Sequence, residues 1–194
     1  EDGRDEIVYG SMVIDDNGKG LSTTGYGHGD AQHVGDFDPY TKGLEFFGCL
    51  KESPVYGSNY RNATTSEVRY KYTHSSDDGR AMMGNCSNTY PGCLGRSVGS
   101  GLISSVSNEE VVSKATADAN DKAALYWSHL NFRIFWDGDL RDEILDSPGT
   151  AQDAAVFDYE SGRLLTTSGC NMNNDSKNNP CFQGDIIVDW REEI

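Results

Sequence analysis

The chain has 194 residues and a formal net charge of −15, with 22 glycines, 10% aromatic residues and 24% charged residues. This composition favours a turn-rich globular protein over a disordered one, and no apolar run approaches the roughly 18 residues of a membrane span. The acidic balance excludes a nucleic-acid partner, because phosphate binding needs clustered Lys and Arg side chains. Acidic turns can bind calcium through their oxygens, but they can equally keep a surface solvated.

Short apolar or alternating runs, separated by Gly, Asn, Asp and Pro, predict strands linked by tight turns along most of the chain. One short helical insertion is predicted within EEVVSKATADANDKAALYW, residues 109–127. The predicted strands fall within residues 6–14, 43–50, 67–74, 131–136, 162–169 and 184–190. These patterns indicate an all-β protein.

An acidic turn followed by a residue that opens a β-run recurs along the chain. The opening residues are Glu6, Glu45, Leu94, Glu143 and Glu193, with Leu94 marking a degenerate copy. Copies roughly 40 to 50 residues apart match the period of a four-stranded propeller blade. We therefore expect the whole chain to be a fragment, with about four blades of a β-propeller and further blades on both sides of it.

The acidic turns place alternating carboxylates beside the glutamate of the next strand, an arrangement that can supply the oxygens that calcium prefers. A single acidic turn is more often solvated than metal-bound, but recurrence at the blade period favours calcium. Three structural calcium sites are predicted, from Asp36, Asp38 and Glu45, from Asp137, Asp139 and Glu143, and from Asp185, Asp189 and Glu193.

Three further polar residues stand in unusual surroundings. His28 lies between two glycines in GYGHGDAQH, where the backbone can approach a ligand closely, although such a histidine more often makes only local hydrogen bonds. Arg80 in SSDDGRAMMG and Lys177 in NMNNDSKNNP are cations among acids and amides. Each of the two could equally form an ordinary surface ion pair.

The chain contains five cysteines, and none of them forms a CxxC pair. Cys170 and Cys181 bracket a polar loop that would gain stability from a disulfide, and Cys86 with Cys93 is a second candidate pair. Disulfides would indicate an oxidising compartment, so we expect a secreted, periplasmic or cell-surface protein.

The strings GYGHGDAQH, DDGRAMM, NFRIFWDGDL, NNDSK and DWREEI follow one another along nearly the whole chain. In this combination the sequence resembles the family 11 rhamnogalacturonan lyases. The resemblance implies an eight-bladed propeller whose central cleft binds rhamnogalacturonan I, an acidic plant cell-wall polysaccharide. It also implies β-elimination at galacturonate with the help of several calcium ions, one of them in the active site.

Motif position in this family assigns roles to four residues. The resemblance implies that His28 binds the active-site calcium, that Arg80 and Lys177 face the cleft, and that Asn174 contacts substrate. Removal of the galacturonate C5 proton creates an enolate-like dianion, which calcium and Arg80 would stabilise, and Lys177 is the candidate base.

Two rival hypotheses stand beside the enzyme. One is a non-catalytic calcium-binding propeller module that binds glycan or protein, and the other is a structural fragment without a function of its own. The combination of His28, Arg80 and Lys177 favours an enzyme, because adhesion does not require it. The chain alone is expected to be inactive, since the rest of the propeller is its expected partner and completes the cleft.

Overall fold

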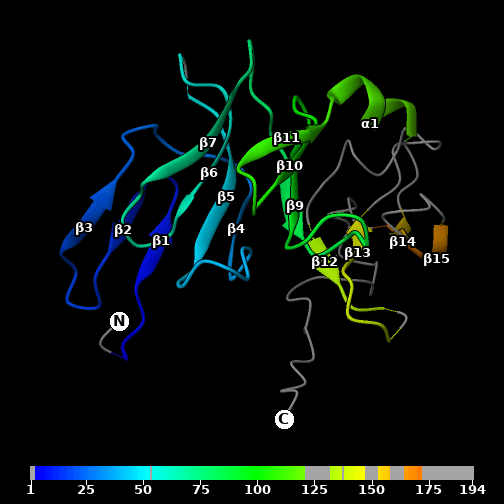
Figure 1. Ribbon diagram of the computed structural model, residues 1–194, viewed down its shortest axis with the longest axis horizontal. Coiled ribbons are helices and arrows are strands. Elements are labelled where there is room, and N and C mark those ends of the chain that lie inside the picture. Colours follow the sequence, from blue (N-terminus) through cyan, green and yellow to red (C-terminus); the bar gives the residue numbers. More distant parts are fainter. Residues whose placement is uncertain are drawn as a thin grey trace.

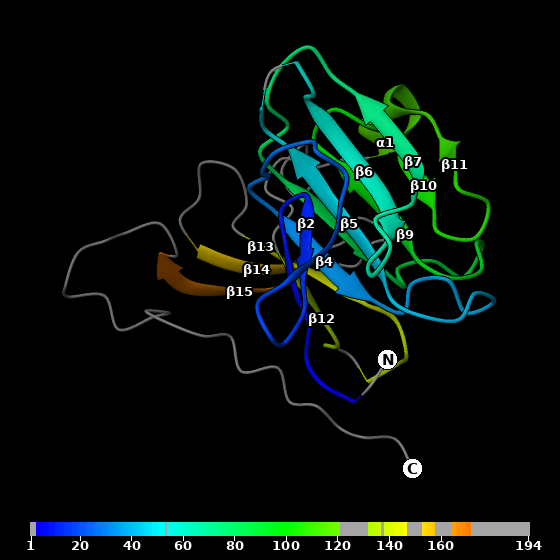
Figure 2. The same ribbon diagram turned by 90° about the vertical axis from the view of Figure 1, so that its left-hand side faces the viewer.

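The computed structural model describes residues 3–52, 54–120, 132–136, 138–146, 153–157 and 164–171. Within these ranges the strands form four antiparallel sheets, of which the first has three strands and the others have four. In every sheet, strands that are consecutive in the chain are also neighbours in space. Figure 1 shows the sheets following one another across the molecule in chain order, and Figure 2 shows the first sheet in front of the second.

The first sheet contains β1 (Ile7–Tyr9), β2 (Met12–Ile14) and β3 (Gly20–Thr23). The second contains β4 (Gln32–Gly35), β5 (Glu45–Leu50), β6 (Gly57–Asn62) and β7 (Val68–Thr73). The third contains β8 (Ala81–Gly84), β9 (Leu94–Ser97), β10 (Leu102–Ser104) and β11 (Glu109–Val112). The fourth contains β12 (Phe132–Ile134), β13 (Glu143–Asp146), β14 (Asp153–Phe157) and β15 (Leu164–Asn171), and helix α1 covers Lys114–Asn120.

The predicted all-β class is confirmed, but the prediction of about four blades of an eight-bladed propeller is wrong. Over the described ranges the four sheets stay separate and close into no barrel or propeller. The repeat period predicts the strands of one sheet and their connections. Closure depends on the packing angles between sheets, which the spacing of residues along the chain does not determine.

The acidic turns do occupy equivalent places in their sheets. Glu45, Leu94 and Glu143 each begin the second strand of a sheet, namely β5, β9 and β13. Each turn therefore connects a first strand to a second strand. The cross-strand pairs that close the three turns are Gly35 with Glu45, Gly84 with Leu94, and Ile134 with Glu143.

Helix α1 lies within the predicted range, and residues Glu109–Val112 at the start of that range form strand β11 against β10. Two adjacent valines in this stretch favour the extended conformation. The helix begins after Ser113, whose hydroxyl accepts a hydrogen bond from the Thr116 N–H at 3.3 Å, as an N-cap does. Residues 121–127 of the predicted range lie outside the described residues. No described helix is long and apolar enough to cross a membrane.

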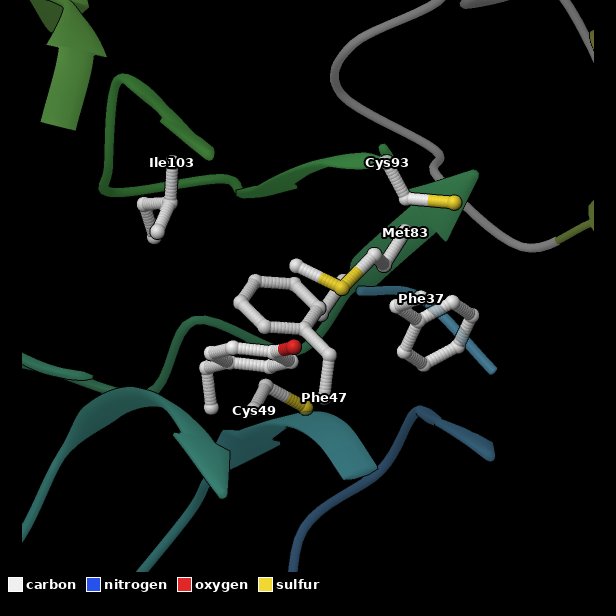
Figure 3. Packing of buried hydrophobic residues seen from close by; sticks show 8 residues of the cluster. Phe37, Phe47, Cys49, Met83, Cys93 and Ile103 are labelled. Carbon is white, nitrogen blue, oxygen red and sulfur yellow. The ribbon is translucent and has the colours of Figure 1, made fainter. Parts of the chain in front are cut away.

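Strand β8 shows how the sheets stack on one another. Side chains alternate between the two faces of a strand, so Ala81 and Met83 face the second sheet while Met82 faces the fourth. Figure 3 shows Met83 packed near Phe47 and Cys49 of β5. The core between the second and third sheets comprises Phe37, Phe47, Cys49, Tyr60, Ala81, Met83, Cys93 and Ile103. The core that reaches the fourth sheet comprises Met82, Cys86, Leu94, Leu102, Ala117 and Ile144.

The cysteine positions correct one prediction. Cys49, Cys86 and Cys93 are buried free thiols, so the predicted pairing of Cys86 with Cys93 is wrong. The two side chains belong to different core clusters. Cys181 lies outside the described residues, and its disulfide with Cys170 stays a prediction.

The first sheet is joined to the second by a buried arginine. Arg61 of β6 donates through Nη2 to the Gly10 carbonyl at 2.7 Å and lies 3.7 Å over the ring of Phe46. Burial lowers the pKa of Arg61 to about 10. The Gly10 N–H in turn donates to Gln32 Oε1 at 3.1 Å, at the start of β4. These bonds fix the turn between β1 and β2 against the loop that carries His28.

Candidate functional site

The loops that carry His28 and Arg80 meet at one end of the strands of the second and third sheets. We call this end the His28 and Arg80 edge. Lys51 Nζ lies 2.6 Å from Asp30 Oδ2 in the first loop and 3.8 Å from Asp77 Oδ2 in the second. The hydrogen bond with Asp30 is the main reason that the pKa of Lys51 is raised, so this side chain stays a cation. In an antiparallel meander the start of β4, the end of β5 and the end of β7 share an edge, which explains why these loops converge.

His28 is held against Glu52 at this edge. Its Nε2 lies 4.0 Å from Glu52 Oε1, and about half of each side chain is exposed. The His28 N–H donates to the same oxygen at 3.4 Å, and the His28 carbonyl accepts from the Lys51 N–H at 3.1 Å. Gly27 has a φ of +81°, and a Cβ there would overlap the Glu52 carboxylate. Glycine is therefore required for the loop to lie this close to Glu52.

Arg80 follows a tight turn at Gly79, which has a φ of +64°. The Arg80 N–H donates to the Asp78 carbonyl at 2.6 Å, and the Gly79 N–H donates to Asp77 Oδ1 at 2.8 Å. The half-buried guanidinium donates through Nη1 to the Gly79 carbonyl at 3.1 Å. Within the described ranges Arg80 forms no ion pair with a carboxylate, in contrast to the ordinary surface salt bridge that the sequence also allowed.

A second histidine lies beside this loop. His74 Nδ1 is 2.7 Å from Asp78 Oδ1, and the Asp78 side chain is fully buried. Asp78 Oδ2 accepts a hydrogen bond from Ser97 Oγ at 2.5 Å. A buried carboxylate therefore connects the end of β7, the Arg80 loop and the end of β9.

The acidic turn of the second sheet lies at the opposite edge and is closed by hydrogen bonds. Glu45 Oε2 accepts from the N–H groups of Phe37 and Asp38 at 3.0 and 3.1 Å. The Asp38 carboxylate accepts from the Tyr40 N–H at 3.0 Å and from Thr41 Oγ1 at 2.5 Å. Asp36, the remaining member of this predicted calcium set, is exposed.

The acidic turn of the fourth sheet uses its carboxylates in the same way. Glu143 Oε2 accepts from the Trp136 N–H at 2.7 Å. Asp139 accepts from the Arg141 N–H at 2.7 Å and from Arg141 Nη2 at 2.6 Å. These oxygens accept hydrogen bonds within the described residues, and the calcium sites at the acidic turns stay a prediction.

The described residues contain no group of three or more His, Cys, Asp or Glu side chains that could hold a metal ion. Several predicted site residues fall outside the described ranges. These are Asp137, Asn174, Lys177, Asp185, Asp189 and Glu193.

Sequence reasoning missed five residues of the His28 and Arg80 edge. Each is a common surface residue in a loop or at a strand end, and its partner is distant in the sequence, so no local pattern distinguishes it. The one available signal was the charged pair that directly follows the apolar strand ending at Leu50. The missed residues are Asp30, Lys51, Glu52, His74 and Asp78.

Comparison with known proteins places the whole chain in a family. Rhamnogalacturonan endolyase YesW of Bacillus subtilis is 36% identical over 208 residues, which cover 100% of this chain and 29% of that protein. Rhamnogalacturonan exolyase YesX of the same organism is 40% identical over 201 residues, which cover 100% of this chain and 32% of that protein. This chain therefore spans less than a third of the length of these relatives.

A solved structure agrees with the sequence comparison. The rhamnogalacturonan lyase PL11 of Bacillus licheniformis matches with a TM-score of 0.71 and 37% identity, over 98% of this chain and 30% of that chain. The family model for the C-terminal domain of rhamnogalacturonan lyase family 11 matches residues 1–194. The chain thus belongs to rhamnogalacturonan lyase family 11, as its C-terminal domain.

Proposed function

We propose that this chain is part of a larger rhamnogalacturonan lyase and lines the place where the polysaccharide backbone is broken. The observation that carries the proposal is the contact of Lys51 with both Asp30 and Asp77, which brings the His28 and Arg80 loops to one edge. The relatives are named as lyases of rhamnogalacturonan, which supports the reaction class and the substrate.

The proposed reaction is β-elimination at galacturonate. A base removes the C5 proton, the C5–H electron pair forms the C4–C5 double bond, and the C4–O4 pair leaves with the O4 oxygen, which takes up a proton to become a hydroxyl. Negative charge grows on the substrate carboxylate as the proton leaves. Arg80 is suited to stabilise this charge, because a guanidinium binds a carboxylate through two parallel hydrogen bonds. Lys177 is proposed as the base and Asn174 as a substrate ligand.

We place the proposed active-site calcium beside His28. The separation of 4.0 Å between His28 Nε2 and Glu52 Oε1 is compatible with one cation between them, since calcium binds oxygen at roughly 2.3 to 2.6 Å. These two side chains would supply part of the ligand shell, and the remaining ligands would come from other parts of the lyase. A bound calcium would add positive charge next to the substrate carboxylate.

The experiment uses the complete lyase with rhamnogalacturonan I and follows the ultraviolet absorbance of the unsaturated uronate product. Arg80→Ala should lower the rate by about 100-fold or more, as loss of a preorganised donor to developing charge does. Arg4→Ala is the matched control, because Arg4 forms an exposed ion pair with Asp16. If the wild type binds the polysaccharide but forms no unsaturated product, the protein is a non-catalytic binding module and the proposal fails.

A further inference from the structure

We infer that His74 and Asp78 are positioning residues for the candidate site, which hold the backbone of Arg80 in place. This inference rests on the proposed function for its catalytic consequence, but its structural part can be tested without activity. It starts from the Asp78 side chain, which is fully buried, with Oδ1 2.7 Å from His74 Nδ1 and Oδ2 accepting a hydrogen bond from Ser97 Oγ at 2.5 Å. Burying a carboxylate is costly, so these two contacts favour one placement of the Asp78 side chain.

The main chain on both sides of Arg80 is tied to the same elements. The Arg80 N–H donates to the Asp78 carbonyl at 2.6 Å, and the Arg80 carbonyl accepts from the Val98 N–H at 3.3 Å. Ser97, which binds the Asp78 carboxylate, directly precedes Val98 in the chain. The side-chain bond of Asp78 and the backbone bond of Arg80 therefore clamp one short loop to the end of β9.

His74 directly follows β7 and contacts the Asp78 carboxylate. The ring packs against Gly99, where a Cβ would lie 3.0 Å from His74 Cγ and would overlap Asp78 Oδ1, so glycine at this position leaves room for both side chains. The His74 side chain is 31% exposed, so the ring covers the buried carboxylate at the rim of the edge. The His74 ring, whose Nδ1 also lies 3.1 Å from the Ser76 carbonyl, thus packs against Asp78, and Asp78 orients the segment that carries Arg80.

Two substitutions separate the positioning role from proton transfer. His74→Asn keeps a donor close to the place of Nδ1 and removes Nε2, whereas His74→Leu removes both nitrogens. In the complete lyase, His74→Leu should lower kcat by about 100-fold with little change in KM, because a displacement of about 1 Å in a site costs that much. His74→Asn should keep kcat within about tenfold of the wild type. If His74→Asn is as inactive as His74→Leu, the important atom is Nε2 and the positioning role is excluded.

A double-mutant comparison tests whether His74 acts through Arg80. In an Arg80→Lys background, which lacks the planar guanidinium, His74→Leu should cause little further loss of kcat, since residues that act as a unit are non-additive. An equal loss of kcat in both backgrounds would overturn the inference. Ser76→Ala is the control, because it removes only a 3.5 Å contact with the His74 ring and should leave kcat unchanged.

Amide hydrogen exchange provides the readout that is independent of catalysis. His74→Leu should accelerate exchange at the Arg80 and Val98 amides by more than about tenfold while the amides of β5 stay protected. Faster exchange in a protein that forms no unsaturated product would preserve the positioning role and refute only the lyase activity. Unchanged exchange at Arg80 and Val98 would refute the positioning role itself.

Discussion

Glu45 Oε1 lies 3.2 Å from Arg69 Nη1, and the Glu45 side chain is fully buried where β5 begins. The same carboxylate accepts two backbone hydrogen bonds from the preceding acidic turn. Glu45→Ala should lower the free energy of unfolding by about 3 to 5 kcal/mol, because it leaves a buried cation and two N–H groups without their acceptor. Urea unfolding measures the change. The exposed Glu67 is the control, since Glu67→Ala should shift the free energy of unfolding by less than about 0.5 kcal/mol. Equal effects of the two substitutions would show that the Glu45–Arg69 pair is unimportant for stability.

The glutamates illustrate what a sequence repeat can predict. The repeat correctly predicts that Glu45, Leu94 and Glu143 occupy equivalent places, because strand length and turn length are local properties. It does not predict what the carboxylates bind. The partners of Glu45 include Arg69, which lies on a different strand, so they depend on the fold and not on the local sequence.

Two variants test where calcium binds. A calcium ion is proposed at His28, whereas the Asp38 carboxylate accepts hydrogen bonds from its own turn. His28→Ala in the complete lyase should weaken calcium binding, because it removes a proposed ligand. Asp38→Asn should leave calcium affinity unchanged, because the Asp38 oxygens face Tyr40 and Thr41. Isothermal titration calorimetry with calcium chloride measures both. The reverse pattern would place the ion at the acidic turn and remove it from the His28 edge.

A half-buried histidine predicts a pH dependence of stability. His33 is half-buried and donates through Nε2 to the Ala81 carbonyl at 3.1 Å. Burial, with a smaller effect of Arg133, lowers the pKa of His33 from 6.5 to about 4. Between these values the unfolded chain binds a proton that the folded chain does not, so the free energy of unfolding falls as the pH decreases through this window. The contribution of His33 is fully present above pH 6.5.

The variant His33→Gln isolates this contribution, because its amide keeps a donor near the position of Nε2 but does not titrate. Urea unfolding at pH 7 and at about pH 4.5 should show a smaller stability loss in His33→Gln than in the wild type. A loss of the same size in both proteins would assign the pH dependence to other groups.

The cysteines should differ in reactivity. Cys49, Cys86 and Cys93 are buried, and burial raises the pKa of Cys93 to about 12, so its thiol is almost never ionised at neutral pH. Native alkylation without reductant followed by mass spectrometry should label none of these three. The same experiment should find Cys170 and Cys181 as a disulfide. Two labelled thiols at these positions would refute the pairing.

The candidate site was predictable only where a residue carries a local signal. His28 stands out through Gly29, which permits a close approach to the Cys49 carbonyl, and Arg80 stands out through Gly79, which adopts a φ of +64°. His74 and Asp78 do not stand out, because a histidine and an aspartate four residues apart in a polar loop normally face water. Burial of Asp78 requires Ser97 from another strand, and such a contact exists only once the third sheet has formed.

The most direct test of the proposed lyase function concerns Lys177, which we propose as the base. Lys177→Ala in the complete lyase should lower the rate of unsaturated uronate formation by ~100-fold to ~10,000-fold, as loss of a general base does. Calcium affinity and thermal stability should not change, because the residue is proposed as a base and not as a ligand. Lys19→Ala in the exposed turn between β2 and β3 is the matched control and should keep the full rate. If Lys177→Ala keeps more than about a tenth of the wild-type rate, the assignment of the base is contradicted.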